Sequence, residues 1–383
     1  MGRVRERPTV PIHPITRRDA IARAGAVVAA GACAAMISCM GEDAAGDGAV
    51  VVYASADDVL ARAVLAECTR ATGVRISPVF DTEATKTVGL ENRIRAERAR
   101  PRADVFWSSE GFAPVRLARE GLLRPIPEPV WSAWPEVHRA GDRRWLAFAA
   151  RARVVVSRSD RGLPRIGTWA ELSLPGLAKG SAASVAIADP RFGTTNGHLA
   201  ALELAWAGAH ARGLPMPTLH EWLDGIRANG VSVRTGGNAA TVESVASGEC
   251  AYGMTDTDDA LAAIARGLPL QMDLPRTLPR GEAGGGTMLV PHTVALVQGG
   301  PGDPAAAERV VAFLASARCE EMIARSESRN LPLAPVSAGA AVDVGFAEPD
   351  PLRFDVAAAS DRARQCSIDA KARLEGVGGG AVA

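Results

Sequence analysis

The chain has 383 residues with 43 basic and 43 acidic side chains, so its formal net charge is zero. A neutral chain has no bulk electrostatic field that would draw it to nucleic acid or to an anionic lipid surface, and we expect no nucleic-acid partner. Its length exceeds what one hydrophobic core usually serves, which favours at least two lobes.

The N-terminus has the order of an export signal. Basic residues are concentrated before position 24 and include the pair Arg17-Arg18, and an apolar run follows over residues 24–35. This run is shorter than the about 20 residues of a permanent membrane span, so a cleaved signal is favoured. The arginine pair is similar to a twin-arginine signal, and Met36-Ile37-Ser38-Cys39 resembles a lipobox. We therefore predict an export signal over residues 1–39, a lipid anchor at Cys39, and a periplasmic or cell-surface location.

Strands and helices alternate along the rest of the chain. Apolar β-branched runs predict strands over residues 50–53, 74–80, 103–107, 154–157, 185–188, 252–255 and 293–297. Apolar residues at helical spacing predict helices over residues 59–72, 88–98, 112–120, 195–209, 219–229, 239–247 and 305–315. This order predicts an α/β fold with mostly parallel sheets and crossover helices. In such sheets ligands bind at the carboxyl ends of the strands.

Carboxylates follow three of the predicted strands. Asp57 follows the first strand, Glu110 follows the third, and Asp256, Asp258 and Asp259 follow the strand at 252–255. Like charges that lie close together are costly unless a cation neutralises them, so the cluster predicts a hard metal ion or an ammonium-bearing solute. Each part also has a structural alternative. Asp57 would serve as a helix cap, and acidic residues are favourable at the start of any helix.

A second group of residues suggests an anion site. Gly193, Thr194 and Thr195 begin a predicted helix, and Asn238 follows two glycines at the start of the next one. Helix starts of this kind leave backbone N–H groups available to an oxyanion. Arg151 enters the same region, with Arg153 beside it, and an arginine adds a charge-assisted contact. The alternative is that these are ordinary helix starts.

Four cysteines remain after the predicted signal. They are Cys68, Cys250, Cys319 and Cys366. No two of them are spaced as CxxC, which disfavours a thiolate metal site. In an oxidising compartment one disulfide and buried free thiols are equal alternatives, and the sequence does not choose among the pairings.

Residues suited to acid–base catalysis are present without a catalytic pattern. The sequence has no GxSxG nucleophile elbow, no phosphate-cradling loop and no histidine pair with metal-binding spacing. His198 lies one helical turn after Thr194 and either faces the site or packs in the core. We therefore expect a binding protein and keep a hydrolytic enzyme as the weakest alternative.

Several stretches together are similar to one known family. The sequences over residues 81–90, 103–110, 151–156, 192–195, 248–253 and 304–316 resemble the iron(III) group of periplasmic solute-binding proteins of ABC importers. The resemblance implies a type II periplasmic-binding-protein fold, with two α/β lobes, each a mixed sheet flanked by helices, joined by hinge strands. It also implies a monomer that delivers a small solute or metal ion to a permease in the inner membrane.

The resemblance also implies a division of the chain. We expect a tether over residues 40–49, a first lobe over 50–147 plus 290–335, and a second lobe over 148–289. The hinge strands are expected near residues 148–151 and 284–289. Residues 336–383 are expected to pack across the lobes and to end in a disordered Gly/Ala tail.

The binding residues of the family carry over only in part. Glu110 matches the family's glutamate, Asp57 stands at its histidine, and Asp256 stands at an asparagine. The hallmark tyrosine pair of the family falls on Asp258 and Asp259. Because the chain has only two tyrosines, which are far apart in the sequence, an adjacent tyrosinate pair cannot hold iron here.

Two ligand hypotheses follow from this departure. The first keeps a metal ion on the aspartates and Glu110, as Fe(III), Ca(II) or Mn(II), with carbonate or phosphate at the helix starts. The second places an organic cation or zwitterion there, such as a polyamine or an aminoalkylphosphonate. Trp107 would then either stack on a cationic group or belong to the core.

Overall fold

The structure is a computed structural model that describes residues 48–81, 88–177, 183–191, 193–334 and 343–376. The predicted export signal, Cys39, most of the tether, and residues 377–383 of the predicted tail lie outside the described residues. Within the described ranges, no helix is both long enough and apolar enough to cross a membrane.

The first lobe is built on β1, β2 and β3, which are parallel. Its elements are β1 (Val50–Ala54), α2 (Asp58–Thr72), β2 (Ile76–Phe80), α3 (Val88–Ala96), β3 (Val105–Ser108), α4 (Phe112–Arg119), β4 (Leu123–Arg124), α5 (Glu128–Ser132) and the short 3-10 helix η2 (Glu136–His138). β1 is a run of apolar residues buried along its whole length, as expected for a central strand. α2 ends where Gly73 takes a φ of 68°, a left-handed conformation that glycine adopts at little cost.

The second lobe is built on β6, β7 and β8, which are also parallel. Its elements are the 3-10 helix η3 (Trp169–Ser173), β6 (Ala183–Ala188), α6 (Gly193–Ala211), α7 (Leu219–Ala228), β7 (Val231–Arg234), α8 (Gly237–Ala246), β8 (Cys250–Asp256), α9 (Thr257–Ala265) and β9 (Leu270–Asp273). β7 and β9 are two strands that the sequence analysis missed, because both are short and only partly buried.

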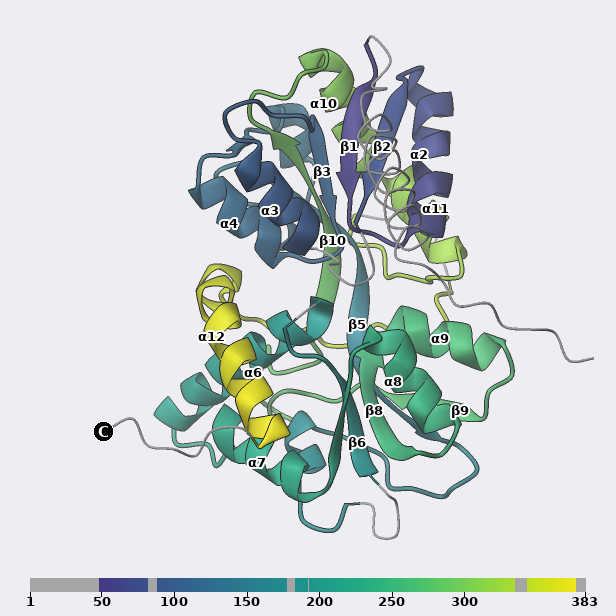
Figure 1. The fold of residues 1–383 in the computed structure, drawn as a ribbon, viewed down its shortest axis with the longest axis vertical. Helices are drawn as coiled ribbons and strands as arrows, with labels where there is room; N and C mark the ends of the chain where they lie inside the picture. Colours follow the sequence, from purple (N-terminus) through teal and green to yellow (C-terminus); the bar gives the residue numbers. More distant parts are fainter. Residues whose placement is uncertain (1–47, 82–87, 178–182, 192, 335–342, 377–383) are drawn as a thin grey trace, which may run out of the picture. The chain divides into compact units, whose positions relative to one another are not determined.

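Two long antiparallel strands connect the lobes. β5 (Leu146–Arg158) pairs over its first half with β10 (Leu289–Val297), and from Arg153 onward it pairs with β8 and β9. β10 in turn pairs with β3 of the first lobe (Figure 1). The strand order is therefore β2-β1-β3-β10-β5-β8-β6-β7, with β4 on β10 and β9 on β5. The exact lobe boundaries stay a prediction.

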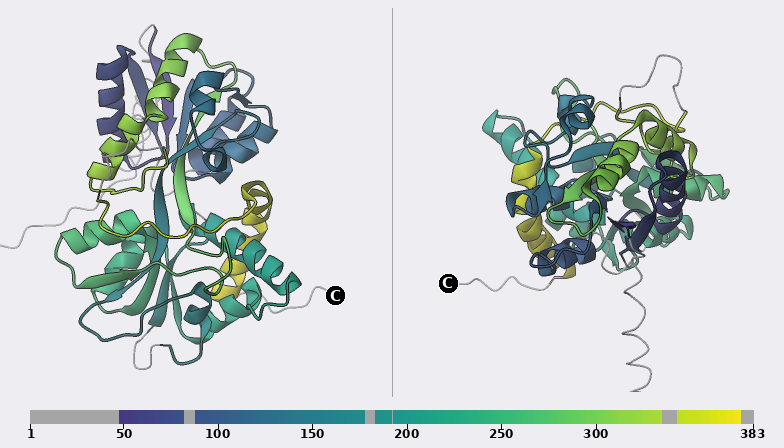
Figure 2. Two further views of the ribbon diagram at one scale, coloured as in Figure 1. Left: turned by 180° about the vertical axis from the view of Figure 1, so that it is seen from behind. Right: turned by 90° about the horizontal axis from the view of Figure 1, so that it is seen from above.

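Three helices follow β10. They are α10 (Pro304–Leu314), α11 (Ala317–Arg325) and α12 (Val356–Glu375). α11 and α12 were not predicted. The segment before α12 runs past the connecting strands, where Leu352 N–H donates to Thr287 O at 2.8 Å (Figure 2). α12 then lies alongside α6 and also touches α4.

Helices cover both faces of each sheet, and apolar clusters fill the layers between them. The tryptophans that are fully buried are Trp107, Trp169, Trp206 and Trp222. Trp107 donates from Nε1 to His292 Nδ1 at 3.1 Å inside this core, so the core interpretation of Trp107 holds and it does not line the cavity described below. Four cysteines are described, and all four are free and buried.

Candidate functional site

A cavity of about 440 Å³ opens at the carboxyl ends of the strands. It brings together all ten site residues predicted from the sequence, which are Asp57, Glu110, Arg151, Gly193, Thr194, Thr195, Asn238, Asp256, Asp258 and Asp259. The first lobe contributes the loops after β1 and β3, and the second lobe contributes the starts of α6, α8 and α9. The strand-end rule accounts for most of this convergence, since all of these residues except Arg151 lie at a strand end or near a helix start, whereas Arg151 lies within the connecting strand β5.

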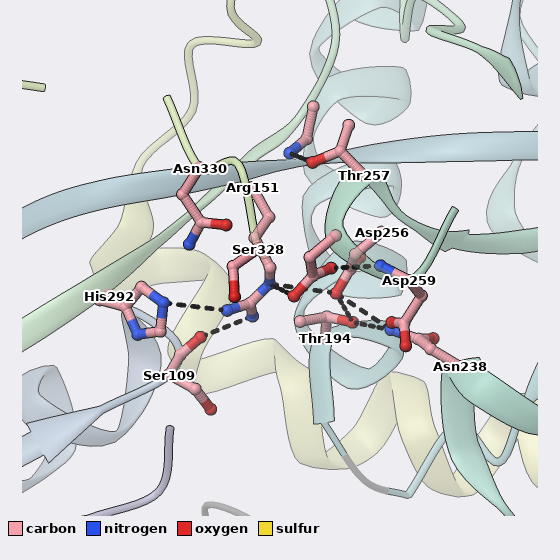
Figure 3. A network of polar contacts seen from close by, with 12 residues as sticks. Ser109, Arg151, Thr194, Asn238, Asp256, Thr257, Asp259, His292, Ser328 and Asn330 are labelled. Atoms are coloured by element: carbon pink, nitrogen blue, oxygen red, sulfur yellow. Dashed lines mark hydrogen bonds and ion pairs between the residues drawn. The ribbon is translucent and has the colours of Figure 1, made fainter. Parts of the chain in front are cut away.

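Asp256 is the centre of a buried polar network (Figure 3). It is the last residue of β8 and is paired in register with Arg153 of β5. Its Oδ1 lies 2.6 Å from Arg153 Nη1, and its Oδ2 accepts from Thr194 Oγ1 at 2.9 Å and Asn238 Nδ2 at 3.0 Å. Burial alone would raise the pKa of Asp256, but the ion pairs with Arg153 and Arg151 outweigh it and lower the pKa. Asp256 therefore carries a charge that is already balanced.

Arg151 links the two lobes through the same network. Its Nε lies 3.4 Å from Asp256 Oδ2 and 3.5 Å from Asp258 Oδ2, both in the second lobe. Its Nη2 donates to the carbonyl of Ser109 in the first lobe at 2.8 Å, and Nη1 lies 3.5 Å from His292 Nε2. Burial alone would lower the pKa of Arg151, but the neighbouring aspartates outweigh burial and raise the pKa above its ordinary value. The guanidinium is thus a fixed cation between the lobes.

Asp258 and Asp259 begin α9 and face the cavity. Together with Asp256 they bring one carboxylate oxygen each within 4.8 Å of one another. Burial raises the pKa of Asp258 to about 6, with Arg151 opposing the shift and Asp256 adding to it. A cation at this position would relieve the mutual repulsion of the carboxylates.

Asp57 and Glu110 line the cavity but also cap helices. Asp57 accepts from the backbone N–H groups of Val59 and Leu60 at 3.0 and 3.3 Å. Glu110 Oε2 accepts from Phe112 N at 2.6 Å and its Oε1 from Ala113 N at 2.8 Å. The capping alternative weighed for Asp57 is therefore what the geometry shows, and Glu110 has the same role. Both carboxylate oxygens of Glu110 already accept hydrogen bonds from the start of α4. A metal ion bound to Glu110 would therefore compete with these backbone N–H groups for the same oxygens.

The starts of α6 and α8 form the opposite wall. Gly193 and Gly237 take φ values of 57° and 72°, which turn the backbone into each helix. Within the described residues, the side-chain oxygens Thr195 Oγ1 and Asn238 Oδ1 are buried without a hydrogen-bond partner. Thr195 is 1% exposed, and its hydroxyl is a donor that the described chain leaves unused at this wall.

The cavity also contains residues outside the predicted site set. They are Leu60, Ser109, Ala188, Asp189, Thr235, Gly236, Ala239, His292 and Ser328, together with Gly237. Ser109 and Asp189 follow predicted strands, and the glycines and Ala239 belong to a predicted helix start, so the same sequence signals point to them. Ser328 comes from the loop after α11, which no sequence pattern connects to the site. Arg153, which was noted only as a neighbour of Arg151, forms the closest ion pair of the network.

Other candidates lie away from the cavity. Tyr53 donates to Glu97, and Tyr252 donates to the carbonyl of Pro164 at 2.9 Å, so neither tyrosine reaches the site. His198 is fully buried with its ring 4.3 Å from that of Trp169. Burial, with the nearby Arg153, holds the pKa of His198 well below its usual value. His198 is therefore a core histidine.

Comparison with known proteins gives the family of the chain. The family of bacterial extracellular solute-binding proteins matches residues 49–326. The major ferric iron-binding proteins of Neisseria gonorrhoeae and Neisseria meningitidis are 32% identical over 109 residues, which are 28% of this chain and 32% of theirs. The chain thus spans about a third of the length of the curated relatives it matches.

Solved structures show the same fold. Iron-bound HitA from Pseudomonas aeruginosa aligns with a TM-score of 0.67 at 20% identity, over 84% of this chain and 99% of that one. FutA from Trichodesmium with iron and citrate aligns at 0.65 and 20%, over 86% and 99%. AfuA from Actinobacillus pleuropneumoniae, with fructose-6-phosphate, aligns at 0.66 and 18%, over 86% and 99%. The predicted two-lobe α/β fold and the resemblance to the iron(III) group are confirmed, and the chain belongs to the bacterial extracellular solute-binding proteins.

Proposed function

We propose that this chain is the solute-binding component of an ABC importer and that it binds a hard metal ion, foremost ferric iron, together with an oxyanion. The observation that carries this proposal is the meeting of the Asp256, Asp258 and Asp259 oxygens within 4.8 Å at a cavity whose opposite wall is two helix starts. Carboxylate oxygens suit hard cations, and helix starts suit anions.

The anion is a necessary part of this proposal. Asp256 is engaged in ion pairs with Arg153 and Arg151, so we assign the metal ion to Asp258, which shares Arg151 at 3.5 Å, and to Asp259. Two carboxylates supply at most about four oxygens, whereas hard cations of this kind take about six or more. Carbonate or phosphate at the starts of α6 and α8 would supply the remaining oxygens and would accept a hydrogen bond from the Thr195 hydroxyl, which has no partner among the described residues.

A zwitterionic organic solute is the second candidate, and the size of the cavity favours it. A volume of about 440 Å³ lies within the roughly 300–1,000 Å³ of pockets for small molecules. An aminoalkylphosphonate would place its ammonium group at Asp258 and Asp259 and its phosphonate at the helix starts. A polyamine would use the carboxylates alone.

Native mass spectrometry of the protein isolated from its own host separates the candidates. A metal ion with a small anion and an organic zwitterion add different masses. Calorimetric titration then tests each one, with ferric nitrilotriacetate plus phosphate and with 2-aminoethylphosphonate as probes. We expect Asp259→Asn to abolish binding and Asp160→Asn, an exposed change far from the cavity, to leave it intact. If neither probe binds, the proposal is wrong.

We also propose that the chain is exported and held to a membrane by lipid on Cys39. Support comes from the basic and apolar order of the first 39 residues and from the extracellular family. Cell fractionation tests it, because Cys39→Ala should move the protein from the membrane fraction to the soluble periplasm. An unchanged distribution would contradict the lipid anchor.

A further inference from the structure

The ring of Phe112 crosses from the first lobe into the core of the second. Phe112 is the first residue of α4, yet it belongs to the apolar cluster of the second lobe, with Leu199 of α6 and Val185 of β6. It is 6% exposed. A side chain of one lobe thus completes the core of the other.

Gly197 of α6 makes room for this ring. A Cβ atom at position 197 would lie 2.0 Å from Cε2 and 2.7 Å from Cδ2 of Phe112, which is closer than real Cβ atoms come. Glycine weakens a helix interior relative to alanine, so a glycine in the middle of α6 calls for a packing reason. The contact with Phe112 supplies that reason.

α12 forms the other wall of the slot. The rings of Phe112 and Phe354, just before α12, have centroids 6.4 Å apart. Ser360 of α12 donates to the carbonyl of Phe112 at 3.4 Å and accepts from Arg116 at 3.3 Å. α12 is itself tied to the second lobe, where Arg362 lies 2.6 Å from Glu203 of α6. In Figure 1, α12 lies beside α6 and beneath α4.

We propose that Phe112 and Gly197 form a latch between the lobes, and that seating the ring in its slot assembles the solute cavity. Glu110 stands two residues before Phe112 and Thr195 two residues before Gly197, and both line the cavity. Because each pair is joined by a rigid helix start, the position of the ring fixes the distance between the two cavity walls. A solute that touches both walls favours the state in which the ring is seated. The contact between Phe112 and Gly197 sets the ratio of closed to open molecules before the solute binds.

Small-angle scattering of the full chain without solute tests the latch. We expect Gly197→Ala to shift the scattering curve toward an open, wider particle, while circular dichroism still shows one cooperative unfolding transition. Gly208→Ala is the matched control on the same helix, because a Cβ there meets only Arg212 Nη1 at 3.7 Å. Its curve should coincide with that of the wild type.

The partner residue gives the second arm of the test. Phe112→Ala should also open the particle, and the double variant Phe112→Ala/Gly197→Ala should behave as Phe112→Ala alone, since no ring remains to collide with the new methyl group. If the single variants lower the melting temperature but keep the wild-type scattering curve, the contact is a permanent core contact and the latch is wrong. The same conclusion follows if Gly197→Ala matches Gly208→Ala.

Affinity provides a further readout. If the closed form falls to a tenth of the population, the apparent affinity for the probe that binds the wild type should fall about tenfold. The scattering arm needs no solute, so failure of the latch and failure of the proposed function are distinguishable.

Discussion

Replacing Asp256 by asparagine removes one charge from the buried network and leaves its shape unchanged. Asp256 is 2% exposed and Arg153 is fully buried, so water cannot replace the lost charge. Among the described residues, Arg153 Nε and Nη2 have no hydrogen-bond partner, and Nη1 depends on Asp256 and Thr194. Removing one partner of a buried ion pair costs about 3–5 kcal/mol. Asparagine retains one acceptor oxygen, so we expect a loss near the lower end, about 3 kcal/mol.

Urea unfolding at pH 7 measures this loss. The midpoint should fall at an unchanged slope, because the surface exposed on unfolding stays the same. Asp57→Asn is the control, since Asp57 is an exposed aspartate of the same cavity and asparagine caps helices as well as aspartate does. It should change stability by no more than about 0.5 kcal/mol. If Asp256→Asn costs no more than Asp57→Asn, the ion-pair reasoning is refuted.

The pH dependence of the loss gives an independent check. The folded pKa of Asp256 is lowered, so its contribution is present above the ordinary aspartate value of about 3.9 and disappears as the pH falls toward the folded pKa. The difference between wild type and Asp256→Asn should therefore be largest near neutral pH and shrink below about pH 4. A difference that grows in acid would contradict the assignment.

Two further predictions concern Asp258, which is partly buried, and Glu320, which is fully buried. The pKa of Asp258 is raised to about 6, so the folded state holds its proton more tightly than the unfolded state, and stability should fall by on the order of 2 kcal/mol as pH rises from about 4 to about 6. Urea unfolding over this range should lose that slope in Asp258→Asn, and an unchanged slope would refute the shift. Glu320, 1% exposed, accepts from the backbone N–H groups of Ala149 and Leu333 at 2.7 and 2.8 Å. Both of these donors bind Oε1, and Ala334 N–H donates to Oε2, so Glu320→Gln turns its amide toward at least one backbone donor and should cost about 1–3 kcal/mol in urea unfolding. Glu321→Gln, at a side chain that is 46% exposed, should cost little. Equal losses would refute that role for Glu320.

The sequence predicted the position of the site because strand periodicity and strand ends are local properties. Asp57, Glu110 and Asp256 were located by the strands that precede them, and parallel topology then places these ends at one cavity. Their pairing partners were not predictable in the same way. The ion pair of Asp256 with Arg153 depends on the register between β5 and β8, which are about a hundred residues apart.

Features that depend on non-local packing escaped prediction. The apolar residues of α12 are mostly alanines and form only a weak stripe, so its periodicity indicated no helix, yet it packs on α6. Gly197 is a second example. From the sequence alone, a glycine within a helical pattern only lowers the stability of the helix, and its packing role becomes visible when the ring of Phe112 lies against it. The structural roles of α12 and Gly197 depend on contacts with residues distant in the sequence, and a single sequence does not show which residues make those contacts.

The charge balance of the cavity limits the class of solute. In the network around Asp256, Arg151 and Arg153 contribute two positive charges, and Asp256, Asp258 and Asp259 contribute three negative ones, which leaves one net negative charge in this network at neutral pH. Asp57 and Glu110 contribute further negative charge, although the positive ends of the helix dipoles that they cap partly offset it. A dianion such as a sugar phosphate, which AfuA holds, would therefore meet repulsion unless a cation came with it. A metal ion with its anion, or a zwitterion, satisfies both walls at once, so inorganic phosphate alone should fail to bind in calorimetry.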